Sequence, residues 1–259
     1  MGEQAPLHWT DPTGSDKHFW HRFSPFYRRH FATLGPVGRV LEFGVLNGAS
    51  IRWLRGLFPA AEIVGVDILP VQPDWPADPA VRYMRADQGD RAGLEVALVG
   101  LGAGFDLVIE DGSHVPQHQA ACLAAAFPLL RPGGLYVLED LHTSLPWHAL
   151  YRHHCAPDTP GSLHLLLAIE HALAVGRPIL PAEAARLAAP GLFSAGEVAA
   201  LAARVAAVEI FRRGSLPLRC WSCGSDRFDY VALRCGCGVS LSLAEPDSMT
   251  AVLRAGASG

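Results

Sequence analysis

The stretch Arg39–Gly48, RVLEFGVLNG, decides the fold: a short apolar run stops at Gly44, and a second glycine closes the turn. Similar runs follow at 63–67, 81–85, 106–110 and 135–139, and helices are expected between them at 49–58, 91–101 and 117–130. Apolar runs that alternate with helices are typical of parallel strands covered on both faces. The pattern predicts an α/β fold.

The bulk composition indicates a globular protein. The chain has 259 residues, is 50% hydrophobic and carries a formal net charge of −4. It contains no Lys/Arg run, which argues against a nucleic-acid partner. No apolar stretch has the length of a membrane span, and the N-terminus lacks the apolar segment of a secretion signal. We expect a cytoplasmic protein with no membrane partner.

The chain divides into four expected regions. They are an N-terminal helical cap over 1–35, the main domain over 36–214, a cysteine module over 215–245 and a tail over 246–259. The pattern is weaker beyond residue 150. It predicts helices over 161–175, 182–189 and 195–205, followed by a returning strand over 206–212.

Polar residues gather where the predicted strands end, which is the edge where parallel sheets bind ligands. Glu42 to Gly48 forms E-x-G-x-x-x-G rather than the dinucleotide pattern G-x-G-x-x-G. An acid before the first glycine would repel a diphosphate but accept hydrogen bonds from an amine or a ribose. Asp67 suits ribose hydroxyls, and Asp87 with Gln88 suits an adenine. This order favours S-adenosylmethionine over NAD, although each residue alone also fits a turn or a helix cap.

Three carboxylates follow the fourth and fifth predicted strands: Asp111, Glu139 and Asp140. If these carboxylates lie close together, their mutual repulsion is costly unless a cation neutralises it. Oxygen ligands favour Mg²⁺, with Ca²⁺ or Mn²⁺ as alternatives. His114 lies three residues beyond Asp111 and could take a proton from a hydroxyl beside that metal. The competing interpretation is that Asp111 caps a helix and that the other two acids lie in a solvated loop.

These motifs together resemble a known family. LEFGVLNGAS, VGVDI, ADQGD, FDLVIEDGSHVPQHQ and RPGGLYVLEDLHTS are similar to the metal-dependent sugar O-methyltransferases of macrolide and related antibiotic pathways, of the mycinamicin and tetracenomycin-rhamnose type. The resemblance covers about residues 13–145 and includes Ser15-Asp16-Lys17 with His21 and Tyr27. Glu110 departs from the pattern, since the family commonly has Asp there. The stretch after residue 150 does not match, so substrate specificity does not carry over.

The resemblance implies a Rossmann-like class I methyltransferase sheet and in-line methyl transfer to a hydroxyl of a small-molecule natural product, such as a sugar or another vicinal diol. Asp111, Glu139 and Asp140 would hold Mg²⁺, and His114 would be the general base. The expected cofactor contacts are Lys17, Glu42, Gly44, Asn47, Ser50, Asp67, Asp87, Gln88 and Asp111. His118, His142 and His148 could shape the acceptor pocket, although ordinary packing explains them more simply. The family also implies a homo-oligomer.

Three other functions compete with this hypothesis. An RNA- or protein-modifying methyltransferase would use the cysteine module for recognition, but the near-neutral charge argues against it. A non-catalytic binding protein on the same fold could have lost Asp67, the expected ribose ligand, or His114, the expected base. The sequence retains both residues. An iron oxygenase, as in a cephalosporin hydroxylase family with similar motifs, would need a second suitably spaced histidine ligand.

The cysteine module carries C-x₂-C and C-x-C pairs with nearby glycines. The four thiols are those of Cys220, Cys223, Cys235 and Cys237. In a reducing compartment such a cluster favours a metal over disulfides. The spacing predicts a tetrahedral structural Zn²⁺ in a zinc-ribbon-like module with one hairpin strand over 228–234. Four reduced cysteines without a metal are the alternative.

Overall fold

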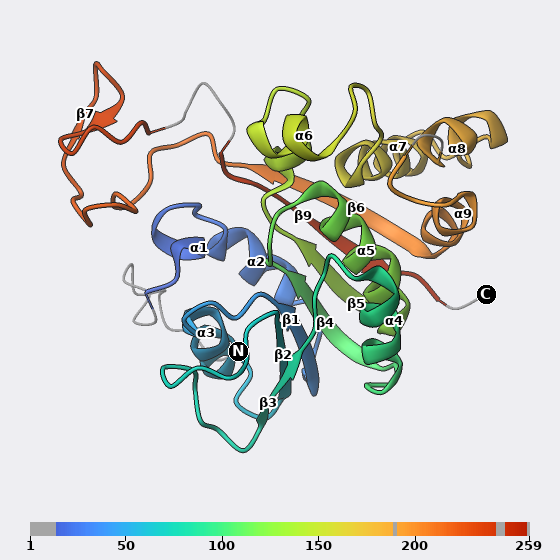
Figure 1. Cartoon of the computed structure of the whole chain (residues 1–259), viewed down its shortest axis with the longest axis horizontal. Coiled ribbons are helices and arrows are strands. Elements are labelled where there is room, and N and C mark those ends of the chain that lie inside the picture. The colour runs from blue at the N-terminus through green and yellow to red at the C-terminus, as the bar shows by residue number, and fades with distance from the viewer. Residues whose placement is uncertain (1–13, 189–190, 242–246, 258–259) are drawn as a thin grey trace.

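The computed structural model describes residues 14–188, 191–241 and 247–257. Its centre is a seven-stranded sheet with the order β3-β2-β1-β4-β5-β9-β6 (Figure 1). The strands are β1 Arg39–Phe43, β2 Glu62–Asp67, β3 Val81–Arg85, β4 Phe105–Glu110, β5 Leu130–Leu138, β6 Val205–Arg212 and β9 Met249–Ala255. A separate hairpin pairs β7 Phe228–Asp229 with β8 Arg234–Cys235.

The first five strands pair in parallel, as the alternating pattern predicts. The predicted turn at 131–134 instead lies within β5, where the pairing with β4 shifts register. The helix expected over 117–130 ends at Ala126, because Pro128 follows and the chain continues as a short 3-10 turn.

Helices cover both faces of the sheet. They are α1 Asp16–Phe19, α2 Ser24–Phe31, α3 Ala49–Leu57, α4 Arg91–Val99, α5 Pro116–Ala126, α6 Ala149–His154, α7 Ser162–Ala174, α8 Pro181–Ala188 and α9 Ala195–Arg204, with 3-10 turns η1 Phe127–Leu129 and η2 Leu141–Ser144. Within the described part of the chain, no helix is both long and apolar enough to cross a membrane.

Successive strand residues point to opposite faces and so build two cores. Val40 and Leu107 join the aromatic side chains of α2 and the apolar face of α3. Their chain neighbours Leu41 and Val108 join α4, α5, α7 and α9 on the other face. All four side chains are fully buried. The continuous apolar runs of the sequence are therefore strands with two buried faces.

The prediction of a C-terminal tail over 246–259 is wrong for Met249–Ala255. This segment is β9, which lies antiparallel between β5 and β6. Its run MTAVLRA is short and follows the cysteine module, so its sequence carries no helix–strand alternation to reveal it. The main domain predicted to end at 214 therefore regains a central strand afterwards, and the cysteine module is an insertion between two neighbouring strands.

Candidate active site

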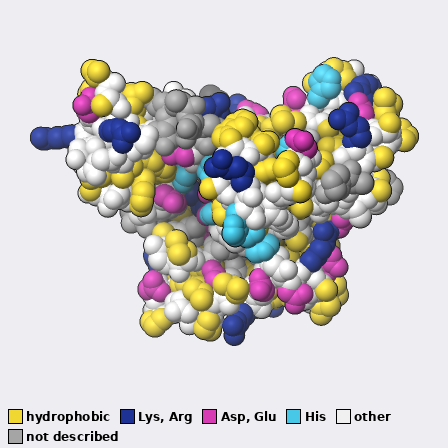
Figure 2. Space-filling view, turned by 45° about the horizontal axis from the view of Figure 1, so that its top comes forward, with side chains coloured by type: hydrophobic (Ala, Val, Ile, Leu, Met, Phe, Trp, Pro, Cys, Tyr) yellow, Lys and Arg dark blue, Asp and Glu magenta, His cyan; other side chains and the backbone are white. Residues whose placement is uncertain are grey.

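A cavity of about 690 Å³ lies at the carboxyl ends of the parallel strands. It is lined by residues of the strand-end loops, of α1 and of the cysteine module. Every residue predicted to bind the cofactor or Mg²⁺ or to act as general base lines it except Glu42: Lys17, Gly44, Asn47, Ser50, Asp67, Asp87, Gln88, Asp111, His114, Glu139 and Asp140. Acidic and histidine side chains accordingly gather near the hollowed middle of the face in Figure 2.

The glycine loop has a shape that only glycine permits. Gly44 has φ +88°, and a Cβ built there would lie 2.0 Å from the carbonyl oxygen of Asp111. A side chain is thus excluded by both conformation and contact. Asn47 Oδ1 accepts a hydrogen bond of 3.0 Å from Ala49 N at the start of α3. The loop after β1 therefore packs directly against the loop after β4.

Asp67 holds the glycine loop from the end of β2. Its Oδ2 accepts hydrogen bonds from Val45 N at 2.8 Å and Leu46 N at 3.3 Å, and its Oδ1 accepts one from Leu69 N at 2.9 Å. A carboxylate can accept more than three hydrogen bonds, so ribose hydroxyls still have lone pairs to bind. The residue lines the cavity while it braces the loop.

Gln88 links the ends of β3 and β4. Its Nε2 donates to Glu110 Oε1 at 2.8 Å, and its Oε1 accepts from Ser113 N at 3.0 Å. Glu110 is fully buried and does not line the cavity, and burial raises its pKa to about 7. Asp87 Oδ1 accepts from Gly89 N at 2.8 Å. Glu110, where the sequence departs from the family pattern, thus accepts a hydrogen bond from Gln88 and does not line the cavity.

Glu42 lies outside the cavity lining and is fully buried. Its Oε1 accepts a hydrogen bond from Ser50 Oγ, and Ser50 lines the cavity. Burial raises the pKa of Glu42 to about 7, despite the opposing effects of Lys17 and of the Ser50 hydrogen bond. The structure thus presents Ser50 to the cavity, and the contact expected of Glu42 remains a prediction.

Asp111, His114 and Asp140 form a group that could hold a metal ion, with ligand atoms within 4.8 Å of one another. His114 Nε2 lies 3.4 Å from Asp140 Oδ2. Asp140 Oδ1 and His114 Nδ1 are buried without a hydrogen-bond partner. His114 and Asp140 have left-handed backbones, with φ +58° and +51°, a strain that is common at functional sites. An orphaned buried carboxylate oxygen is the donor that a cation would satisfy.

Glu139, the third predicted metal ligand, does not belong to this group, and it pairs with Lys17. The Lys17 ammonium contacts Asp111 Oδ2 and lies 2.9 Å from Glu139 Oε1. Burial lowers the pKa of Lys17, but the charges of Asp111 and Glu139 outweigh that effect and raise it well above its ordinary value. Lys17 lines the cavity, yet its cation is bound to two predicted metal ligands rather than presented to a cofactor.

Burial lowers the pKa of His114, but the negative charges of Asp140 and Asp111 outweigh it and raise the pKa above its ordinary value. The other histidines differ in position. His118 lines the cavity, and its Nδ1 lies 2.7 Å from Ser113 Oγ. His142 and His148 pack edge to face at 5.2 Å and do not line it, as ordinary packing predicts.

Two aromatic side chains of the cavity were not predicted as site residues. Trp221 lines it from the cysteine module with 60% of its surface exposed, and Phe19 lines it from α1. Neither residue follows a strand of the alternating pattern, so the expectation that ligands bind at the ends of parallel strands does not predict them. The only sequence signal is the position of Trp221 inside the C-x₂-C pair.

Comparison with known proteins bears on this site. Residues 41–141 match the family model described as "Methyltransferase domain". They include the glycine loop, Asp67, Gln88, Asp111, His114 and Asp140, so the match covers the strand-end part of the cavity lining but not Lys17, Phe19 or Trp221.

Two curated relatives are sugar O-methyltransferases by name. The 8-demethyl-8-(2-methoxy-alpha-L-rhamnosyl)-tetracenomycin-C 3'-O-methyltransferase of Streptomyces olivaceus is 37% identical over 56% of this chain and 37% of its own length. The Mycinamicin VI 2''-O-methyltransferase of Micromonospora griseorubida is 39% identical over 49% of this chain and 33% of its own. The matches thus span little more than a third of either relative. The resemblance inferred from the motifs is confirmed.

A solved structure extends the match to the fold. MycE methyltransferase from the mycinamycin biosynthetic pathway, in complex with Mg and SAH, superposes with a TM-score of 0.63 and 25% identity. The superposition covers 96% of this chain and 52% of that one. The predicted Rossmann-like class I methyltransferase sheet is therefore confirmed.

Proposed function

We propose that this chain is an S-adenosylmethionine-dependent, divalent-metal-dependent O-methyltransferase that acts on a hydroxyl of a vicinal diol, as in a glycoside of a natural product. The observation that carries it is the contact between the glycine loop and the backbone of Asp111. This contact supports a shared site, because the expected cofactor loop and a candidate metal ligand both line the same cavity. The names of the relatives support the sugar acceptor.

The cavity fits the cofactor in size and in chemistry. Its volume of about 690 Å³ lies in the ordinary range of small-molecule sites. Asp67, Asp87 and Gln88 would hold the adenosine half. The glycine loop and Ser50 would hold the amino-acid half. S-adenosylmethionine, when bound, would supply the methyl group from its sulfonium.

The acidic group fits a hard divalent ion. Asp111 and Asp140 would hold Mg²⁺, or Ca²⁺ or Mn²⁺, and Glu139 would join them if the Lys17 ammonium withdrew. The ion would lower the pKa of an acceptor hydroxyl beside it. The solved MycE complex contains Mg, which supports this assignment.

His114 would take the proton of the acceptor hydroxyl. Asp140, 3.4 Å from its Nε2, would orient the imidazole and stabilise its charged form. Without a metal, the charges of Asp140 and Asp111 raise the pKa of His114; a bound divalent ion would offset those charges and favour the neutral ring that a base requires. The strained backbones of both residues fix this pair in the cavity. The histidine thus acts as base, and the aspartate positions it.

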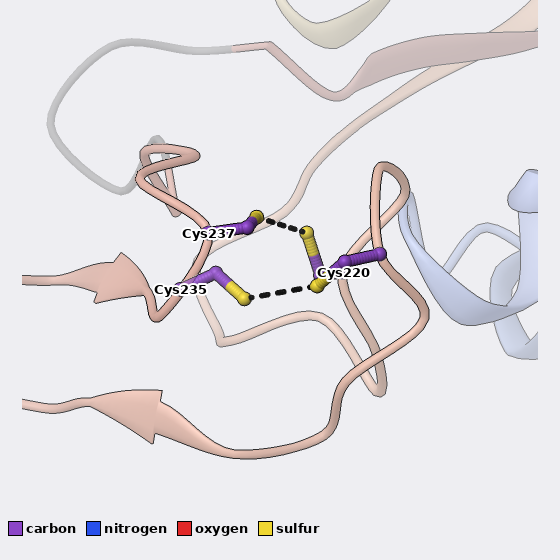
Figure 3. A group of neighbouring side chains, drawn as sticks. Cys220, Cys235 and Cys237 are labelled. Carbon is purple, nitrogen blue, oxygen red and sulfur yellow. Dashed lines mark hydrogen bonds between the residues drawn. The ribbon is translucent and has the colours of Figure 1, made fainter.

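We also propose that the four cysteines bind a structural Zn²⁺. Their Sγ atoms lie 3.6 Å apart for Cys220 and Cys237, and 3.4 Å apart for Cys223 and Cys235. A tetrahedral zinc with bonds of about 2.3 Å implies sulfur separations of about 3.8 Å. Figure 3 shows the sulfur atoms of Cys220, Cys235 and Cys237 directed into one space. The homo-oligomer expected from the sequence remains a prediction, as do the region boundaries other than that of the tail.

The function is tested with two acceptor probes: methyl α-L-rhamnopyranoside and mycinamicin VI. Calorimetry should show S-adenosylhomocysteine binding in the presence of chelator. Mass spectrometry should show methyl transfer to a probe with Mg²⁺ and none with chelator. The 3-deoxy analogue of the rhamnoside, which keeps the hydroxyls at C2 and C4 but has no vicinal diol, is the matched control acceptor. Undiminished transfer in chelator would rule out the metal, and failure to bind S-adenosylhomocysteine would rule out the methyltransferase.

A further inference from the structure

The cysteine module emerges at the edge of the sheet that holds the cavity. β6 and β5 both run antiparallel to β9, so β6 points the same way as the parallel strands. The module connects Arg212 at the end of β6 to Met249 at the start of β9, and these two residues are paired. An insertion at this point therefore leaves the sheet at the carboxyl ends of the parallel strands, and Figure 1 shows it as a lobe beyond α1.

The module is fastened to α1, the helix that carries Lys17. The backbone nitrogens of Leu218 and Arg219 donate to Phe19 O at 2.7 and 3.4 Å. Arg22 donates to Ser215 Oγ at 3.0 Å. These contacts join the cysteine module to the same helix whose ammonium binds Asp111 and Glu139.

Trp221 projects from this module into the cavity lining. It lies between Cys220 and Cys223, the two thiols of the C-x₂-C turn, and packs edge to face on Trp20 at 6.5 Å. Its indole is nevertheless 60% exposed. An exposed aromatic plane beside convergent polar groups is characteristic of small-molecule sites.

We propose that Trp221 is an aromatic wall of the acceptor site, and that the metal bound by the four cysteines holds it there. The inference rests on the proposed function and assigns the module to acceptor recognition. The indole would stack on the apolar C–H face of the sugar while the sugar hydroxyls face Asp111 and Asp140. Trp221 is thus a specificity-determining residue, and the cysteines are positioning residues.

The first test compares acceptor binding with cofactor binding. Affinities for the two acceptor probes are measured by calorimetry with Mg²⁺ and S-adenosylhomocysteine present. Trp221→Ala should weaken acceptor binding about tenfold, as expected for loss of a stacked aromatic contact, and leave S-adenosylhomocysteine affinity unchanged. Trp221→Phe should keep most of the wild-type affinity for the acceptor. Tyr230→Ala, which removes an exposed aromatic of the same module outside the cavity lining, is the matched control and should change neither affinity.

The second test removes the metal. Zinc content, measured by inductively coupled plasma mass spectrometry, should fall from one ion per chain to none in a Cys223→Ser, Cys237→Ser variant, whose two thiols are exposed. That variant should lose acceptor affinity as Trp221→Ala does and keep its affinity for S-adenosylhomocysteine. Stripping zinc from the wild-type protein and restoring it gives the same comparison without a substitution.

Several results would overturn the inference. Unchanged acceptor affinity in Trp221→Ala, or an equal loss of S-adenosylhomocysteine affinity, would remove Trp221 from the acceptor site. Normal acceptor binding by zinc-free protein would remove the positioning role of the metal. A wild-type protein that binds S-adenosylhomocysteine but neither probe would overturn the acceptor class. Wild-type protein that binds no S-adenosylhomocysteine would instead overturn the proposed function.

Discussion

Replacing Lys17 with methionine should destabilise the metal-free protein and strengthen its binding of divalent ions. The ammonium is 2% exposed and neutralises Glu139, also 2% exposed, together with the partly buried Asp111. Removing one partner of a buried ion pair costs about 3–5 kcal/mol because the other charge stays behind. Glu139 has a pKa raised well above its ordinary value by burial and by Asp111, so it can take up a proton and relieve part of that cost. We expect a loss of about 3 kcal/mol at neutral pH.

The assay is urea denaturation of wild type and Lys17→Met, with chelator and with Mg²⁺. Mg²⁺ at about 100 times its Kd should return about 3 kcal/mol to the variant. In the wild-type protein the ion must displace the ammonium, so Mn²⁺ titrated by electron paramagnetic resonance should bind the variant at least about tenfold more tightly, a difference of about 1.4 kcal/mol. Lys17→Arg keeps the charge and is the control.

Two results would refute this reasoning. Wild-type stability of Lys17→Met in chelator would show that the ammonium does not neutralise the acids. Equal Mn²⁺ affinity in the two proteins would show that ammonium and metal do not compete for the same carboxylates.

Three further changes have definite expected outcomes. The folded-state pKa of Glu42, about 7, lies above its ordinary value of 4.5, so the folded protein binds the extra proton between these values and its stability should fall by about 3 kcal/mol as pH rises from 4.5 to 7. Glu42→Gln should make that slope shallower in urea denaturation at pH 5 to 8 and leave the part due to Glu110, whose pKa is also about 7; an unchanged slope would exclude Glu42 as a source of it. Gly44→Ala should cost more than about 2 kcal/mol and abolish S-adenosylhomocysteine binding, because its Cβ would meet Asp111 O at 2.0 Å; near-native stability would contradict the loop geometry. Asp67→Asn should weaken S-adenosylhomocysteine binding about tenfold in calorimetry, since an amide accepts fewer of the loop's hydrogen bonds; unchanged affinity would exclude Asp67 from the site.

The sheet and most of the cavity could be predicted because their signals are local. Apolar runs that end in Gly44, Asp67 or Asp111 identify the strands, and parallel pairing then brings their ends to one edge. Strand β9 lacked such a signal. Its place between β5 and β6 depends on antiparallel pairing with segments more than a hundred residues away in one case and about forty in the other.

The charge arrangement of the site could be predicted only in part. Three acids at neighbouring strand ends predict a nearby positive charge. They do not predict which of the acids pairs with a lysine and which is left to bind a metal ion. Lys17 comes from α1, far from the acids in sequence, and it pairs with Asp111 and Glu139, of which only Asp111 belongs to the group that His114 joins. The position of Trp221 depends on how the insertion folds back over α1, which no periodic pattern encodes.

The central claim is that a sulfonium methyl and a divalent ion lie side by side in this cavity. The direct measurement is the nuclear magnetic resonance relaxation of S-adenosylmethionine labelled with carbon-13 in its methyl group, bound to protein loaded with Mn²⁺. We expect strong paramagnetic broadening in the wild-type protein and little in an Asp111→Asn, Asp140→Asn variant that still binds the cofactor. A sharp methyl signal from wild-type protein that holds both Mn²⁺ and S-adenosylmethionine would contradict the claim.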